Sequence, residues 1–466
     1  MSREGKLAKN TLILAFGTFF PKMAIFITLP VLTAMLTKEE YGTYDLVITL
    51  VALILPAATL QIQTAAFRFL IDVHEDEKEK SLIITNIYAF VLPITFVILI
   101  ILFVFLRGVS VVEKLSICAY FLFDILVNVN RQIIRGLSRN VDYAISALIS
   151  SIGHIILVLI LVMGMKQGLS GGLASLAFAE GFSSIYLFII GRIPKFLGKQ
   201  YISRTKLKEL LSYSWPMVPN GLSQWVIHAS DRLVITFFLG ITANAVYSVA
   251  YKIPQILSLA QTTFNMAWQE NASLTVNDED VISYYSSMFQ LLFNIVSGMM
   301  SILIGLTPML FLIFIKGDYA EAYNQIPILF MGMFFLCLST FWGGLFVAQK
   351  QTKEVGLTTV IAAVINLSID LIFVRKIGIY AGSISSLTAY FSLCLLRARE
   401  IQKKIKIDYH YKTIGIILGI LVFQCIICLQ KSTILNYINI CIGIMIGILL
   451  NRKLIGIVFH KSKMMV

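Results

Sequence analysis

Charged residues are scarce in this chain of 466 residues, because only 14% of it is Asp, Glu, Lys or Arg. Soluble domains carry about 25% charged and about 45–50% apolar residues, whereas 58% of this chain is hydrophobic and its mean hydropathy is +0.84. Apolar runs of about 18 residues or more recur from end to end, and each is typical of a membrane-spanning helix. The composition excludes a string of soluble domains and predicts an all-α polytopic membrane protein.

Signals for catalysis and cofactors are also lacking. The chain contains no G-x-x-x-x-G-K-[ST] phosphate-binding loop and no H-E-x-x-H zinc motif. Its longest predicted external loops are too short for a glycosyl-transferring active site, which argues against a membrane polymerase or ligase. All six cysteines fall inside predicted spans, so Cys425-x-x-Cys428 is interpreted as helix packing. We expect a protein that is not an enzyme and needs no cofactor or metal.

The apolar runs predict about fourteen membrane spans. They lie at residues 10–33, 44–70, 82–106, 114–135, 143–165, 169–191, 213–238, 243–268, 283–315, 323–348, 355–374, 378–397, 413–429 and 434–450. With the N-terminus inside, the cytoplasmic segments hold 26 Lys and Arg and the external segments hold 8. Because basic residues gather on the cytoplasmic side, we expect both termini in the cytoplasm. The net charge of +13 follows from this bias and does not indicate nucleic-acid binding.

Two basic loops divide the spans into two six-helix lobes and an appendix. We predict an N-lobe at 1–191, a basic cytoplasmic linker at 192–212, a C-lobe at 213–397, and a segment 398–466 with a basic loop, helices 13 and 14 and a cytoplasmic tail. Leu36–Tyr44 aligns with Leu239–Tyr247 at a shift of 203 residues, with Leu and Tyr matched at the ends. This supports a parallel repeat. The apolar and basic faces of 203–214 predict an interfacial helix, with a plain charged loop as the alternative.

Charged residues inside the spans are the candidate functional residues, because each is costly in the bilayer. The bases are Lys22, Arg68, Arg232 and Lys252; Arg68 and Lys252 are also placed where they could snorkel to the interface. The acids Asp124, Glu180 and Asp231 are candidates for ion coupling. Neither Glu180 nor Asp370 has a partner evident from the sequence, and structural hydrogen bonding is the alternative for both. The bases occur at several predicted depths, which favours a cationic central cavity and an anionic substrate.

One predicted span carries a continuous polar stripe. Asp124, Asn128, Arg131 and Arg135 follow the spacing i, i+4, i+7 and i+11 and share one helical face. Arg131 and Arg135 also satisfy the positive-inside rule, which is the alternative explanation for each of them. The stripe adds both arginines to the predicted substrate-binding set.

The residues resemble those of Wzx-type polysaccharide flippases. The resemblance rests on LAKNTLILAFGTFFPKMAIFITLPVLTAMLTKEEYGTYDL, on Ala66-Phe67-Arg68-Phe69, and on LKELLSYSWPMVPNGLSQWVIHASDRLVITFFLG followed by AVYSVAYKIP. It covers most of residues 6–270 in pattern and the remainder in helix count. These flippases belong to the multidrug/oligosaccharidyl-lipid/polysaccharide exporter superfamily. The resemblance implies two lobes in a V around a central cavity that opens alternately to each side.

The resemblance also implies a function. The substrate would be an undecaprenyl-diphosphate-linked oligosaccharide, moved from the inner to the outer leaflet of a bacterial cytoplasmic membrane for surface polysaccharide biosynthesis. Membrane lipids and pathway enzymes, such as a polymerase or glycosyltransferases, would be its partners, and nucleic acid would not. A lipid II flippase and a drug/cation antiporter of the same superfamily are the alternatives. Export could be driven by the membrane potential acting on the diphosphate, or by proton or sodium counter-transport through Asp124, Asp231 or Glu180.

Overall fold

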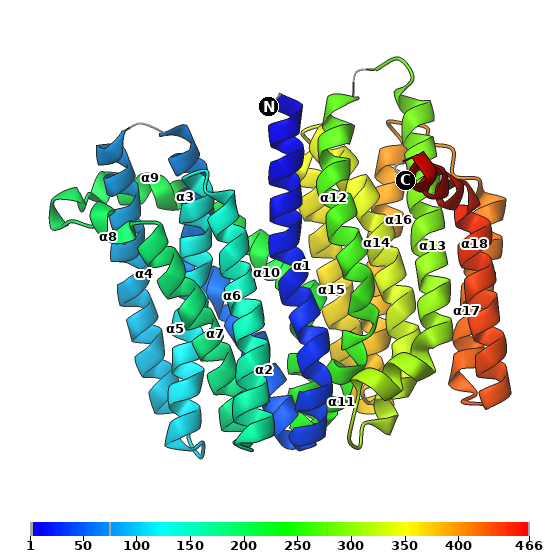
Figure 1. The fold of residues 1–466 in the computed structure, drawn as a ribbon, viewed down its shortest axis with the longest axis horizontal. Helices are drawn as coiled ribbons and strands as arrows, with labels where there is room; N and C mark the ends of the chain where they lie inside the picture. The colour runs from blue at the N-terminus through cyan, green and yellow to red at the C-terminus, as the bar shows by residue number, and fades with distance from the viewer. Residues whose placement is uncertain (1–2, 74–75, 277, 465–466) are drawn as a thin grey trace. The chain divides into compact units, whose positions relative to one another are not determined.

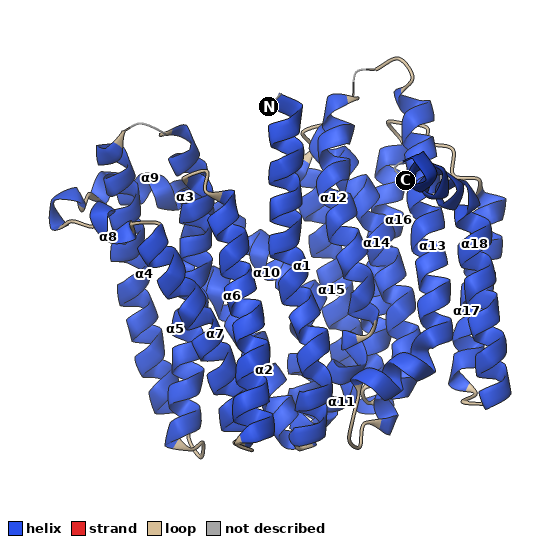
Figure 2. Cartoon of the chain, viewed as in Figure 1, coloured by secondary structure: helices blue, strands red, loops and turns tan. Residues whose placement is uncertain are grey.

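The computed structural model describes residues 3–73, 76–276 and 278–464, and these residues form helices and short connections without a strand (Figure 2). Ten helices among them are long and apolar enough to cross a membrane. The others, such as α5 (Val111–Gly136) and α16 (Tyr380–Gln402), carry more polar residues. The prediction of an all-α polytopic protein is confirmed.

The chain divides into two compact units, 1–225 and 226–466 (Figure 1). The first contains α1 (Arg3–Met35), α2 (Lys38–Thr59), α3 (Ile62–Asp72), α4 (Glu77–Phe105), α5, α6 (Asn140–Leu157), a π-helix (Val158–Gly164), α7 (Gly168–Ile190), α8 (Ile193–Phe196) and α9 (Arg204–Ser214). The division falls within α10 (Val218–Leu239). The second unit continues with α11 (Ile241–Lys252), α12 (Leu257–Leu274), α13 (Val281–Phe314), α14 (Ile326–Ala348), α15 (Thr352–Ile377), α16, α17 (Tyr411–Leu429) and α18 (Thr433–Met464).

Two predicted spans are interrupted. The span at 44–70 breaks at Leu60 and Gln61, which have φ of 47° and 58° in the left-handed region and separate α2 from α3. The span at 243–268 breaks between α11 and α12, where Pro254 lacks the N–H that a continuous α-helix needs. Sequence periodicity alone showed continuous apolar segments, so these breaks were not predicted.

The basic segment between the two six-span halves is folded against the first unit. Its α9 follows Ser203, whose side chain accepts from the N–H of Lys206 as an N-cap. Lys206 Nζ lies 2.5 Å from Glu79 on α4 and 2.8 Å from Glu209. The Tyr213 ring packs edge-on against Phe69 of α3 at 5.6 Å. A helix therefore forms where the sequence predicted one, and it packs along α3 and α4.

Within the second unit, the two C-terminal helices pack against α13 through small and polar residues. A Cβ at Gly305 of α13 would lie 2.8 Å from the carbonyl of Asn439, and one at Gly443 of α18 would lie 2.6 Å from the carbonyl of Ser301. Ser301 donates to Gln424 of α17 at 2.6 Å. Glycine allows this close approach, and buried hydrogen bonds join helices in an apolar medium. In Figure 1, α17 and α18 lie beside α13.

Candidate functional site

A half-buried ion pair lies at the centre of a polar network in the first unit. Nη2 of Arg131 on α5 is 3.5 Å from Glu180 on α7, and the two side chains are 18% and 22% exposed. The same guanidinium donates to Ser150 at 2.9 Å and to Ser183 at 3.4 Å. The three helices α5, α6 and α7 are thereby joined through one arginine. Its neighbours are hydroxyls and one carboxylate, which satisfy a buried cation.

The other members of the polar stripe have different surroundings. Asp124 lies within electrostatic range of both Glu180 and Arg131. Asn128 donates to the carbonyl of Asp124, one turn earlier in α5, at 2.8 Å. Arg135 instead stacks on aromatic rings, with its guanidinium carbon 4.7 Å from the centroid of Phe67. The predicted stripe therefore contains a carboxylate-rich part around Glu180 and a cation–π part around Phe67.

The two basic candidates near the start of the chain also differ. Lys22 lies one residue after Pro21 within α1 and is half-buried. Arg68, near the end of α3, makes an ion pair of 2.6 Å with Asp72, and the two side chains are 50% and 60% exposed. Exposed pairs of this kind contribute little to stability. Of the two, Lys22 is the more enclosed.

In the second unit, Asp231 of α10 is the centre of a second buried network. Its Oδ2 accepts hydrogen bonds of 2.6 Å from Tyr247 on α11 and of 2.6 Å from Ser386 on α16. Asp231 is 3% exposed, and its Oδ1 has no hydrogen-bond partner among the described residues. A carboxylate that keeps a buried oxygen available can receive a proton or a cation.

A second carboxylate, which the sequence left without a partner, lies beside the first. Asp370 of α15 is 1% exposed and interacts electrostatically with Asp231. Both of its carboxylate oxygens are buried and have no hydrogen-bond partner within the described chain. Asn366, one turn earlier, accepts from Ser230 at 3.0 Å and donates to Ser385 at 3.2 Å. Two neighbouring carboxylates in one buried site can share a proton, because both cannot easily be ionised together.

Next to the acids lie a cation and a chain of aromatic hydroxyls. Arg232 is buried, and its guanidinium carbon is 5.5 Å from the ring centroid of Tyr251. Tyr251 and His228 both bond to the hydroxyl of Tyr390, each at 3.0 Å. Lys252 is the last residue of α11, immediately before the break at Pro254. Both charges of the Asp231-Arg232 dipeptide lie within electrostatic range of Tyr251 and Tyr390.

The sequence interpretation missed one buried arginine. Arg397 was assigned to the edge of a basic loop, but α16 continues to Gln402 and leaves Arg397 only 7% exposed. Its guanidinium donates to Thr359 of α15 at 3.1 Å and to the carbonyl of Ser339 on α14 at 3.2 Å. It forms no ion pair with a carboxylate in the described part of the chain. In the sequence, the adjacent hydroxyl residues Thr358 and Thr359 were the feature that could have indicated a buried hydrogen-bond partner for Arg397.

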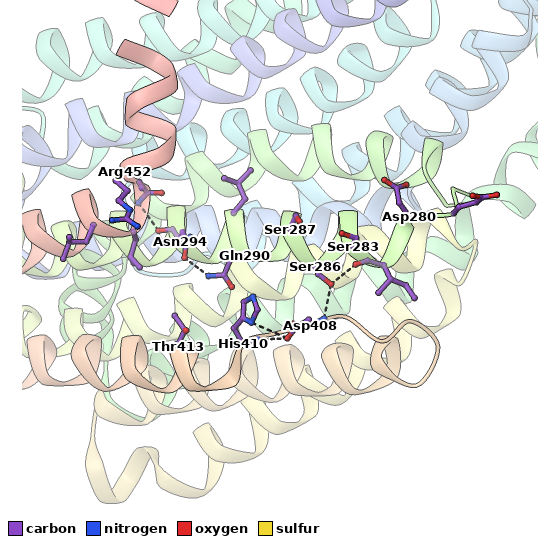
Figure 3. Close-up of a pocket in the computed structure, with 16 residues that line it drawn as sticks. Asp280, Ser283, Ser286, Ser287, Gln290, Asn294, Asp408, His410, Thr413 and Arg452 are labelled. Carbon is purple, nitrogen blue, oxygen red and sulfur yellow. Dashed lines mark hydrogen bonds and ion pairs between the residues drawn. The ribbon is translucent and has the colours of Figure 1, made fainter. Parts of the chain in front are cut away.

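A polar pocket of about 1060 Å³ lies between the beginnings of α13 and α17 and the middle of α18, at residues 449–452 (Figure 3). Its groups bond one another: Ser286 accepts from the backbone N–H of Asp408 at 3.0 Å, and Gln290 donates to Asn294 at 2.9 Å. His410 lies 3.6 Å from Asp408, and both are exposed. Its lining has three acids, Glu279, Asp280 and Asp408, against Arg452 and His410, so acids predominate. None of the predicted site residues lies in it.

The described residues contain no group of three or more His, Cys, Asp or Glu placed to hold a metal ion. Among the candidate site residues, Arg131 with Glu180 and Asp231 with its neighbours are instead the centres of two networks, one in each unit. These networks depend on hydroxyl groups of Ser146, Ser150, Ser183, Ser230, Ser385 and Ser386. Serine is common in helices for packing reasons, so the sequence alone gave no reason to select these six.

Known structures share this arrangement of helices. The chain is similar to a lipid II flippase MurJ in an inward closed conformation, with a TM-score of 0.74, 16% identity, and coverage of 95% of this chain and 100% of that one. It is also similar to an inward-facing multidrug resistance MATE family transporter of the MOP superfamily, with a TM-score of 0.70, 14% identity, and coverage of 84% and 98%. It is similar as well to a MOP superfamily transporter from Pyrococcus furiosus, with a TM-score of 0.57, 13% identity, and coverage of 85% of this chain and 95% of that one. At these identities the likeness shows the fold.

The family of the chain follows from its sequence. No curated protein matches the chain. Residues 7–269, more than half of the chain, match the family described as polysaccharide biosynthesis protein. This range includes all of the first unit's predicted site residues together with Asp231, Arg232 and Lys252. The chain is therefore a member of the polysaccharide biosynthesis protein family, with the helical fold of the MOP superfamily transporters.

Proposed function

We propose that this protein exports an undecaprenyl-diphosphate-linked oligosaccharide across the bacterial cytoplasmic membrane by alternating access. The observation that carries the proposal is the family match over residues 7–269. Basic side chains within membrane-spanning helices support an anionic substrate, since a buried cation attracts a diphosphate. Arg232 is buried and Lys22 is half-buried within α1, and we take these two as the principal substrate-binding candidates, with Arg68, Lys252, Arg131 and Arg135 as the wider set.

The direct test is a flipping assay with the purified protein in liposomes. A fluorescent undecaprenyl-diphosphate-linked oligosaccharide is placed in both leaflets, and its exposure is followed by an impermeant quencher. Protein-dependent exchange of this substrate is the expected result. Lipid II serves as the second substrate, because the likeness to MurJ favours it, and a cationic drug serves as the third, because of the likeness to MATE transporters. Movement of the drug alone would contradict the proposal.

The buried acids suggest how the protein uses energy. In this proposal Asp231 and Asp370 hold a proton or a monovalent cation that returns inward as the substrate leaves, and Asp124 and Glu180 are further candidates in the first unit. The diphosphate itself carries about two negative charges, and each is worth about 2.3 kcal/mol per 100 mV across the membrane. Cation entry and anion export are both favoured by an inside-negative potential, so the two contributions add.

Liposomes can separate the two contributions. A pH or sodium gradient without a potential tests ion coupling. A potassium/valinomycin potential without an ion gradient acts on both charges in the parent protein, and it tests the charge of the substrate alone once ion coupling has been removed. Asp231→Asn with Asp370→Asn should remove the gradient response and leave the response to the potential. Asp278→Asn, an exposed loop acid, is the matched control. A double variant that keeps its full gradient response would remove these acids from the mechanism.

A further inference from the structure

An apolar slot with a basic end lies in the second unit and shares no lining residue with the network around Asp231. It has a volume of about 590 Å³ and is bounded by α13, α14, α16 and α17. Trp342 and Phe335 of α14 lie in its lining, with Phe391 and Leu395 of α16. Trp342 is 3% exposed, whereas Phe391 and Leu395 are 41% and 52% exposed. The slot therefore has a buried aromatic interior and an apolar opening at the surface of the unit.

The charges of the slot are confined to one end and have one sign. Of the described residues in its lining, Arg399 and Lys403 carry charge, and both are basic and exposed. They are four residues apart, at the end of α16 and just beyond it, so they lie on the same side of this helix end. Lys403 also pairs with Glu400 at 2.6 Å, but an ammonium has three donors and can bind a further anion.

This distribution of charge fits an amphiphile with an anionic head. We propose that the slot binds one anionic phospholipid of the inner leaflet, with an acyl chain against Phe391 and Leu395 and the phosphate at Arg399 and Lys403. The volume is in the range of small-molecule sites. The basic end of α16 is cytoplasmic in the orientation predicted from the sequence, and the inner leaflet carries the anionic lipids. The inference does not depend on which substrate is exported.

The test is lipid binding to the purified full-length protein, measured by native mass spectrometry. After delipidation, phosphatidylglycerol or phosphatidylcholine with identical acyl chains is titrated, and bound lipids are counted. We expect one high-occupancy phosphatidylglycerol and weaker phosphatidylcholine binding. Arg399→Gln with Lys403→Gln should weaken phosphatidylglycerol binding by roughly tenfold or more, because a basic residue near lipid contributes about 1 kcal/mol. Leu395→Trp should weaken it by narrowing the opening, without a change of charge.

The matched control is Lys406→Gln with Lys412→Gln, which removes the same charge from two exposed residues outside the slot lining. Equal loss in the control would show general surface attraction and overturn the proposal, as would equal affinity for the two lipids. Undecaprenyl phosphate is added as a competitor. If it displaces phosphatidylglycerol at equal concentration, the slot holds polyprenyl chains and the phospholipid assignment is wrong. Unfolding temperatures of all variants establish that they remain folded.

Discussion

Tyr247 of α11 donates a hydrogen bond of 2.6 Å to Oδ2 of Asp231 on α10, and both side chains are almost completely buried. A hydrogen bond to a carboxylate contributes more than one between neutral groups. We expect Tyr247→Phe to lower the free energy of unfolding by about 1–3 kcal/mol, measured by denaturation in detergent. Tyr323→Phe removes a longer bond to the carbonyl of Cys428 and should cost less. If the two variants lose the same free energy of unfolding, the loss does not come from the carboxylate of Asp231.

The network around Arg131 predicts an asymmetric pair of variants. Arg131→Met leaves the half-buried Glu180 carboxylate without its cation. It should lower the free energy of unfolding by about 3 kcal/mol or more. Glu180→Gln should cost less, about 1 kcal/mol, because Arg131 keeps its serine partners. Arg68→Met, in an exposed pair with Asp72, is the control and should change stability by less than about 1 kcal/mol. If Glu180→Gln lowers the free energy of unfolding as much as Arg131→Met does, the serine hydroxyls do not compensate Arg131 for the lost carboxylate.

Lys22 predicts an effect on export without an effect on protein level. Lys22→Ala removes the half-buried charge of α1 and should abolish surface polysaccharide in a complementation assay, because the diphosphate loses a cationic contact. Lys22→Arg retains the charge and should retain more activity. Lys316→Ala changes an exposed lysine in a predicted external loop and should export normally. Normal polysaccharide with Lys22→Ala at normal protein level would reject a substrate-binding role.

The orientation in the membrane can be tested at two exposed residues. Lys199→Cys lies in the basic segment after α8, and Lys431→Cys lies in the turn between α17 and α18. An impermeant maleimide applied to whole cells should label position 431 and should label position 199 only after permeabilisation. The parent protein, with its six native cysteines, measures the background. Labelling of both positions from outside would contradict the fourteen-span topology.

The sequence was sufficient for the helical membrane fold because apolar runs are local signals. It also indicated Asp231, Arg131 and Glu180 as candidates, since charged residues inside a membrane helix are conspicuous. It gave no partners, because the contacts of Asp231 with Ser386 and of Arg131 with Ser183 join residues far apart in the chain. Arg397 was missed for a related reason: its burial depends on how far α16 extends, and helix ends are the least predictable feature.

The break between α2 and α3 holds two residues in a backbone conformation of higher energy than the α-helix. Leu60 and Gln61 both adopt a left-handed conformation, which costs roughly 1–2 kcal/mol for each residue with a Cβ. A continuous helix through this point would recover that energy and would rotate the end of α3, which carries Arg68, relative to α2. The local backbone therefore favours straightening, and the packing of the surrounding helices must oppose it. A second state of the transporter with looser packing at this point would therefore recover backbone energy on straightening, and this gain would offset part of the packing that is lost.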